Sequence, residues 1–224
     1  MRRFLREQGL TLAFTALLLG ALSGQALSGL ALVNERAVAA GLPRTSLGAY
    51  VTSSSFAADV AENWQSEYLQ FLLYILLTVW LLQRGSPESK PLDKAGRESD
   101  AQQRVGSHAS PSAPRWAVVG GWRRGVYSRS LGLVMGVLFA GSWAAQLVAG
   151  RSAYNADQLQ ELQAPLGWGE YLAAPEFWNR TFQNWQSEFL AVASMVVFSI
   201  YLRERGSPES KPVGEPHSTT GSTG

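Results

Sequence analysis

Two glutamates stand at the start of apolar runs, and each could act as a charged group at a membrane. Glu67 ends the motif NWQSE at residues 63–67, and Glu188 ends an identical motif at residues 184–188. As helices, the uncharged runs after them would be about 24 and 21 Å long, against a bilayer core of about 30 Å. We therefore expect both carboxylates at the outer edge of the hydrocarbon, where a charge needs a polar partner.

Two glutamines are the predicted partners of these carboxylates. Gln25 and Gln146 each interrupt another apolar block, at a distance from its outer end that matches the depth of the glutamates. If the helices of each half are antiparallel neighbours, Gln25 lies beside Glu67 and Gln146 beside Glu188. Such a polar membrane site either holds two helices together or binds a cation or proton. One acid per half, near the membrane edge, favours the holding role.

Other reactive groups offer little. The chain has no cysteine, which excludes disulfides and thiolate metal sites. Both histidines, His108 and His217, lie in segments rich in Pro, Ser and Gly. No nucleophile–base set, metal-ligand cluster or phosphate-binding loop is present in the pattern, so we predict no enzymatic activity, no metal and no cofactor. The balance of 19 basic and 17 acidic residues gives no reason to expect nucleic acid as a partner.

Four apolar blocks must position the polar residues. The first and third blocks, residues 10–33 and 130–150, carry no charge and no regular polar stripe. That pattern argues against buried helices of a soluble bundle, and the internal position of the third block argues against reading the first as a signal peptide. A membrane-spanning helix needs about 20 mostly apolar residues. The predicted spans are residues 10–33, 64–83, 130–150 and 185–202.

The chain repeats itself at a constant shift of 121 residues. Without any gap, 27 of the 91 positions in residues 1–91 match residues 122–212, including NWQSE and the octet RGSPESKP. We predict an all-α polytopic membrane protein, built as two tandem helical hairpins of parallel orientation with pseudo-two-fold symmetry. The repeats are joined by a flexible linker at residues 92–121, and a disordered tail follows at residues 213–224.

The distribution of charge predicts the orientation in the membrane. Fifteen of the nineteen Lys and Arg residues lie in the N-terminal segment, the middle segment and the tail. Under the positive-inside rule these three segments, and hence both termini, are cytoplasmic. The NWQSE motifs then face outside, where Trp64 and Trp185 are expected to anchor the helices at the interface. The expected localisation is the inner (plasma) membrane, with multiple spans.

The octet RGSPESKP follows the second apolar helix of each half. Gly85 and Gly206 are placed to end these helices in the left-handed conformation. Eight identical residues are more than a helix end requires, so we also predict a cytoplasmic docking turn. Its members are Arg84, Ser86, Pro87 and Glu88 in the first copy, and Arg205, Ser207, Pro208 and Glu209 in the second.

Several motifs together resemble a family of small bacterial membrane proteins known as a domain of unknown function. They are FLREQGL at residues 4–10, GQAL at residues 24–27, NWQSEFL at residues 184–190, and GSPESKP in both copies. The resemblance implies a bacterial inner-membrane protein and brings no catalytic residues. We expect a structural or interaction component of the envelope, in contact with the bilayer and with a protein partner or a second copy. The alternative is a small transporter or channel component with Glu67 and Glu188 as cation or proton sites.

Overall fold

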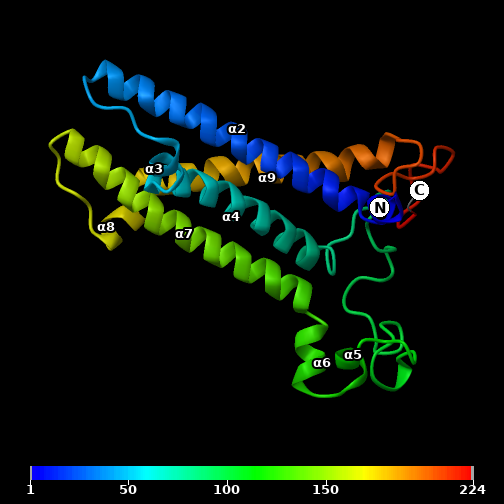
Figure 1. The fold of residues 1–224 in the computed structure, drawn as a ribbon. Helices are drawn as coiled ribbons and strands as arrows, with labels where there is room; N and C mark the ends of the chain where they lie inside the picture. The colour runs from blue at the N-terminus through cyan, green and yellow to red at the C-terminus, as the bar shows by residue number, and fades with distance from the viewer. Residues whose placement is uncertain (1, 223–224) are drawn as a thin grey trace. The chain divides into compact units, whose positions relative to one another are not determined.

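A computed structural model of the protein describes residues 2–222, and within them every regular element is a helix (Figure 1). The elements are α1 (Arg2–Glu7), α2 (Gly9–Ala39), α3 (Leu47–Val51), α4 (Ser54–Leu77), η1 (Gly106–His108), α5 (Arg115–Val118), α6 (Trp122–Tyr127), α7 (Ser130–Gln160), α8 (Trp168–Ala173) and α9 (Pro175–Tyr201). The all-α fold class is confirmed. Residues 223 and 224 of the predicted tail lie outside the described residues.

The helices α2 and α7 are the two that are long and apolar enough to cross a membrane within residues 2–222. Each has 31 residues and a mean hydropathy of 1.8 over its best window. Their bounds coincide after the shift of 121 residues found in the sequence. Large apolar side chains remain exposed along both helices, among them Phe14, Leu17 and Val137. Contiguous exposed apolar surface of this kind indicates a membrane or a partner around the helix.

The helices α4 and α9 fall short of the same test, so by length and composition there are two candidate spans and not four. Both begin well before the predicted spans, and α4 ends at Leu77, not at residue 83. Their N-terminal parts carry charged residues, which are Asp59, Glu62 and Glu67 in α4, and Glu176, Arg180 and Glu188 in α9. Only the part after Glu67 in α4 and the part after Glu188 in α9 are free of charge and mostly apolar.

The described chain folds as two compact units. The first unit contains residues up to 60 together with residues 145–171, and the second contains residues 61–144 together with residues from 172 onward. The helices α4 and α7 each contribute to both units, because the boundaries at residues 60 and 144 fall within them.

In the first unit, α2 turns back through a short loop into α3, and two contacts hold this turn (Figure 1). The side-chain amide of Asn34 donates to the carbonyl of Thr45 at 3.0 Å, and its oxygen accepts from the Thr45 N–H at 2.6 Å. Tyr50 is buried with its hydroxyl against Gly29, so close that a Cβ on this glycine would lie 2.0 Å from the oxygen. The absence of a side chain at Gly29 is therefore what seats Tyr50.

The turn from α7 into α8, also in the first unit, repeats these contacts 121 residues later. Asn155 donates to the Leu166 carbonyl at 3.0 Å and accepts from its N–H at 2.8 Å. Tyr171 packs its hydroxyl against Gly150 at 2.5 Å from the place of a Cβ. One contact is new, because Arg151 donates to the same Leu166 carbonyl at 2.9 Å. Equivalent residues thus make equivalent contacts in the two halves.

Replacing Gly150 by alanine is expected to destabilise the protein. Tyr171 is only 2% exposed and has no room to swing away from the added methyl, so overpacking should cost about 1–3 kcal/mol. Gly141→Ala on the same helix is the matched control, since nothing lies within 4 Å of its Cβ position. Alanine there should leave stability unchanged or raise it. Thermal denaturation in detergent compares the two variants, and equal midpoints would contradict the steric account.

In the second unit, α4 and α9 run parallel and the first half of α7 runs antiparallel to α4. The direction of α7 follows from two contacts, because Leu76 lies 3.6 Å from the Cβ position of Gly132 and Leu72 lies 3.9 Å from that of Gly136. Glycines four residues apart leave a shallow groove on α7, and the leucines of α4 occupy it.

An aromatic cluster joins α7 to α9 within the second unit. The ring of Trp143 lies 6.2 Å from that of Phe177, 6.0 Å from that of Trp178 and 5.9 Å from that of Trp185. Phe139 stacks on the other side of Trp143 at 5.6 Å. Aromatic pairs at these distances contribute more free energy to packing than the burial of their apolar area alone accounts for.

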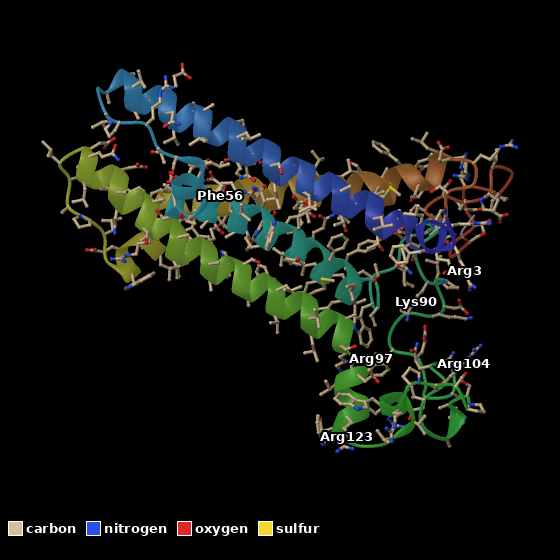
Figure 2. All side chains as sticks on the ribbon, viewed as in Figure 1. Arg3, Phe56, Lys90, Arg97, Arg104 and Arg123 are labelled. Atoms are coloured by element: carbon tan, nitrogen blue, oxygen red, sulfur yellow. The ribbon has the colours of Figure 1, made fainter. Side chains whose placement is uncertain are left out.

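The segment between α4 and α7 consists mostly of turns, and its basic side chains are distributed along it (Figure 2). Lys90 donates to the Gly96 carbonyl at 3.0 Å and pairs with Glu98 at 3.1 Å. Arg124 lies 3.5 Å from Asp100. These local contacts hold individual turns, and the segment has few buried apolar side chains.

Candidate functional site

The two NWQSE motifs lie against each other in the second unit, on the parallel helices α4 and α9. Trp185 donates a hydrogen bond from Nε1 to Oε1 of Gln65 at 2.8 Å. The hydroxyl of Ser66 lies 3.5 Å from Oε1 of Glu188. Gln65 and Ser66 are 0% and 1% exposed. The two buried polar residues of the first motif thus each meet a residue of the second, and buried polar groups require such partners.

An ion pair joins the same helices about one turn earlier. Arg180 donates from Nε and Nη2 to the two carboxylate oxygens of Glu62, at 2.6 and 3.2 Å. Two parallel bonds of this kind form the strong bidentate geometry. The pair is absent from the repeated pattern, since Asp59 and Gln183 stand at the shifted positions. Repeat reasoning therefore missed it. We call the six residues the polar clamp: Glu62, Gln65, Ser66, Arg180, Trp185 and Glu188.

Two residues of the predicted membrane site, Glu67 and Glu188, belong to the second unit. Glu67 is exposed, and its carboxylate lies close enough to Glu188 for the two charges to interact. Gln25 is half-buried and Gln146 is 2% exposed, and both belong to the first unit. Their pairing with the glutamates stays a prediction. The contact of Glu188 with the first motif links the two halves of the chain. The prediction from sequence places each glutamate in a site within its own hairpin.

The two predicted tryptophan anchors have different surroundings. Trp64 is 44% exposed, as a residue at a membrane interface would be in the absence of lipid. Trp185 is half-buried, since it packs on Trp143 and donates to Gln65. Trp185 therefore holds the helices of the second unit together, beyond any anchoring role.

The two RGSPESKP octets form the same turn. Gly85 and Gly206 have φ of 84° and 86°. In the first copy the Ser89 hydroxyl accepts from the Gln83 N–H at 3.0 Å, and in the second Ser210 accepts from the Glu204 N–H at 3.0 Å. The prediction that the glycines end the helices is wrong, because α4 stops at Leu77 and α9 at Tyr201. Their left-handed backbone instead shapes a turn some residues further on.

Hydrogen bonds of Lys211 hold the C-terminal segment against the turn of the first RGSPESKP octet. Its ammonium donates to the carbonyl of Gly85 at 2.7 Å and to three carbonyls of the tail, those of Pro216, His217 and Thr219, at 3.2, 2.9 and 3.2 Å. The side chain is 1% exposed. Burial, and next the charge of Arg203, lower the pKa of Lys211. The structure thus places the predicted tail, up to residue 222, against the first turn, and its disorder stays a prediction.

The two copies of the turn differ in exposure for this reason. Two hydrogen bonds join the tail to the first turn: Gly85 N–H donates to the Thr220 hydroxyl at 2.9 Å, and Gly221 N–H donates to the Ser86 carbonyl at 3.0 Å. The tail therefore covers Ser86 and Pro87 of the first copy, which are buried. In the second copy Pro208 and Glu209 are exposed and Ser207 is half-buried, and the arginines that open both copies, Arg84 and Arg205, are exposed. A partner would find the second turn accessible.

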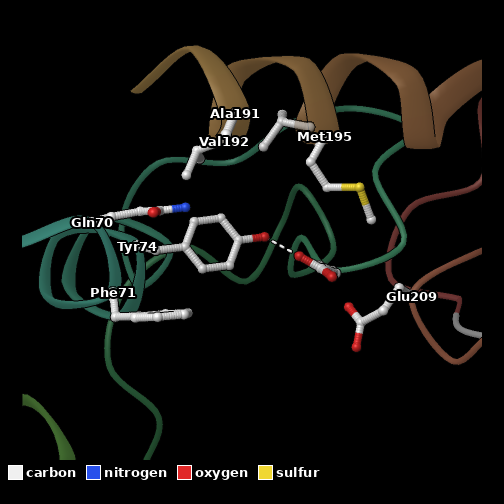
Figure 3. A pocket seen from close by; sticks show the side chains of 9 residues that line it. Gln70, Phe71, Tyr74, Ala191, Val192, Met195 and Glu209 are labelled. Atoms are coloured by element: carbon white, nitrogen blue, oxygen red, sulfur yellow. Dashed lines mark hydrogen bonds between the residues drawn. The ribbon is translucent and has the colours of Figure 1, made fainter. Parts of the chain in front are cut away.

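A cavity of about 300 Å³ lies where α4, α9 and the two turns meet (Figure 3). Its residues are Gln70, Phe71, Tyr74, Glu88, Ala191, Val192, Met195, Val196 and Glu209. Four pairs among them are related by the shift of 121 residues: Gln70 with Ala191, Phe71 with Val192, Tyr74 with Met195, and Glu88 with Glu209. The cavity therefore forms between equivalent surfaces of the two halves.

Two carboxylates face the cavity from the two turns. The Tyr74 hydroxyl donates a hydrogen bond to Oε2 of Glu88, as Figure 3 shows. A hydrogen bond with Glu88, then the negative charge of Glu88, then burial raise the pKa of Glu209. A like charge nearby disfavours the ionised form of a carboxyl group. The sequence named both glutamates as docking residues, but only the fold brings them together.

Comparison with protein families places the chain. A search of the curated proteins and a search of the solved structures each found no match. A family model covers residues 1–222. The resemblance noted from the motifs is confirmed at the level of an uncharacterised family. The chain belongs to the family described as Domain of unknown function (DUF6766).

Proposed function

We propose that this protein is a multi-pass protein of the bacterial inner membrane and serves as a structural or interaction component without catalytic activity. Two long helices, each with a charge-free apolar stretch and exposed apolar surface, support its place in a membrane. The polar clamp is the observation that carries the structural role, since its ion pair and hydrogen bonds join α4 of the first repeat to α9 of the second.

The polar clamp also supports membrane passage by α4 and α9. These helices have 24 and 27 residues, about 36 and 40 Å, which exceeds a bilayer core of about 30 Å. Transfer of a single charged helix into hydrocarbon has a high free-energy cost, and paired charges and hydrogen bonds lower that cost. Together with α2 and α7, these helices make four membrane helices, arranged as two tandem hairpins, with the termini and the linker in the cytoplasm.

The structure supports a duplication of the chain, as the sequence does. The bounds of α2 and α7, the Asn34 and Asn155 bonds, and the serine bonds of the two turns all recur at the shift of 121 residues. We further propose that the exposed second turn, with Arg205, Ser207, Pro208 and Glu209, contacts a protein partner or a second copy.

Cysteine labelling from outside the cell tests the topology, and the cysteine-free chain suits it. Leu42→Cys and Gln163→Cys are expected to react with a membrane-impermeant maleimide in intact cells. Ala101→Cys, in the linker, is expected to react only after the membrane is opened. Labelling of residue 101 from outside would overturn the four-helix topology, while failure of all three sites even in opened membranes would show that the protein is not expressed or is aggregated.

Transport is the second candidate function, favoured by the closeness of the Glu67 and Glu188 charges. Here the carboxylates would bind a cation or proton at the outer edge of the membrane. Reconstituted vesicles distinguish the two functions. Absence of proton or cation flux above that of empty vesicles removes the transport role, and flux that survives E67Q/E188Q shows that these residues are not its site.

A further inference from the structure

We propose that the cavity between α4, α9 and the two turns binds a small organic ammonium ion with an apolar or aromatic body. The inference goes beyond the structural role and does not depend on it. It rests on three observations within the second unit: a cavity large enough for such a molecule, walls that are mainly apolar, and a pair of carboxylates at one end.

The walls suit the apolar body of such a ligand. The helix α9 lines one side with aliphatic and thioether side chains, those of Val192, Met195 and Val196. The helix α4 adds the rings of Phe71 and Tyr74 (Figure 3). Pockets for small molecules are commonly apolar with a few convergent polar groups. Aromatic faces beside a carboxylate also attract quaternary ammonium groups through the ring quadrupole.

The carboxylates supply the complementary charge. Glu88 and Glu209 come from equivalent places in the two turns, and Tyr74 is the other titratable group facing them. No lining residue from α9 titrates. Because the pKa of Glu209 is raised, its carboxyl group keeps a proton to higher pH than usual, and a bound cation would displace that proton. Ligand binding should therefore release a proton and strengthen as pH rises.

A metal ion fits less well than an organic cation. In the part of the chain that the structure describes, no group of three or more His, Cys, Asp or Glu side chains could hold one. Calcium takes six to eight oxygen ligands, and this cavity reaches six only if both carboxylates, the phenol and the carboxamide all turn toward one point among apolar walls. An anion is disfavoured by the carboxylates themselves.

Binding of benzyltrimethylammonium to the full chain tests the proposal. The protein is placed in phosphatidylglycerol nanodiscs, which contain no competing amine, and titrated calorimetrically. We expect E88Q/E209Q, which keeps the shape of both side chains, to weaken binding by about tenfold or more. Glu204→Gln is the matched control, because Glu204 is an exposed glutamate beside the second turn that does not line the cavity. It should bind as the wild type does.

A second variant separates the cavity from mere surface charge. Val192→Trp keeps both carboxylates and fills the space, so it should abolish binding while its thermal midpoint shows that the protein is folded. Between about pH 5 and pH 8 wild-type affinity should increase, and the increase should vanish in E88Q/E209Q. No wild-type binding across this range, or equal binding by E88Q/E209Q, would overturn the proposal.

The same assay identifies the source of the ammonium group. If phosphatidylethanolamine added to the nanodiscs displaces the probe, the natural ligand is a lipid headgroup. If the probe binds as before, the cavity selects a free ammonium compound. Either result is consistent with the cavity as an ammonium site.

Discussion

Arg180→Ala is expected to lower the free energy of unfolding by about 2 kcal/mol and the thermal midpoint by about 4–8 °C. The substitution removes both hydrogen bonds that Glu62 receives from Arg180, at 2.6 and 3.2 Å. The Glu62 side chain is 14% exposed, so water replaces them poorly. The estimate is below the 3–5 kcal/mol of a fully buried pair, because 30% of the Arg180 side chain is exposed.

Controls for this variant come from the same chain. Arg205→Ala removes an exposed arginine and should leave the midpoint unchanged. The exchange E62R/R180E restores an ion pair between α4 and α9 and should recover part of the loss. Tryptophan fluorescence during thermal denaturation in detergent measures all three. A midpoint of Arg180→Ala equal to that of Arg205→Ala would show that the pair contributes nothing to holding the helices.

Lys211→Met is expected to release the tail from the first turn. It deprives four carbonyls of their donor at a place where the side chain is 1% exposed, and each buried group left unsatisfied costs about 1–3 kcal/mol. Separation of the tail lets water reach those carbonyls. Hydrogen exchange at the amides of Gly85 and Gly221, which bond across the contact, should accelerate by about tenfold or more.

The repeat supplies the matched control for this experiment. Lys90 stands at the shifted position, but it donates to the Gly96 carbonyl and pairs with Glu98. Lys90→Met should therefore leave the exchange of Gly85 and Gly221 unchanged. If Lys211→Met shows wild-type exchange, the tail is held by its other bonds and the lysine is dispensable. In that case the difference in exposure between the two turns needs another cause.

The long apolar helices were predictable because their signal is local. Charge-free, mostly apolar sequence over 24 and 21 residues predicted the spans inside α2 and α7, and no distant contact can change the composition of a segment. The repeat was equally accessible, since identical motifs at one shift predict identical turns. Serine bonds and left-handed glycines in both octets agree with this. The predicted ends of α4 and α9 were wrong. Each helix ends several residues before the glycine of its octet, and the sequence in between carries no strong local signal for a helix end.

The partners of the polar residues depended on the tertiary structure. Local spacing suggested that Glu188 pairs within its own hairpin, whereas the fold places it beside Ser66 of the other copy. Arg180 and Glu62 likewise come from halves that are far apart in the chain, and so do the carboxylates of Glu88 and Glu209. Composition and periodicity describe how one segment meets its surroundings. Which face of α4 meets which face of α9 is decided by packing over the whole second unit, and that choice created the polar clamp and the cavity.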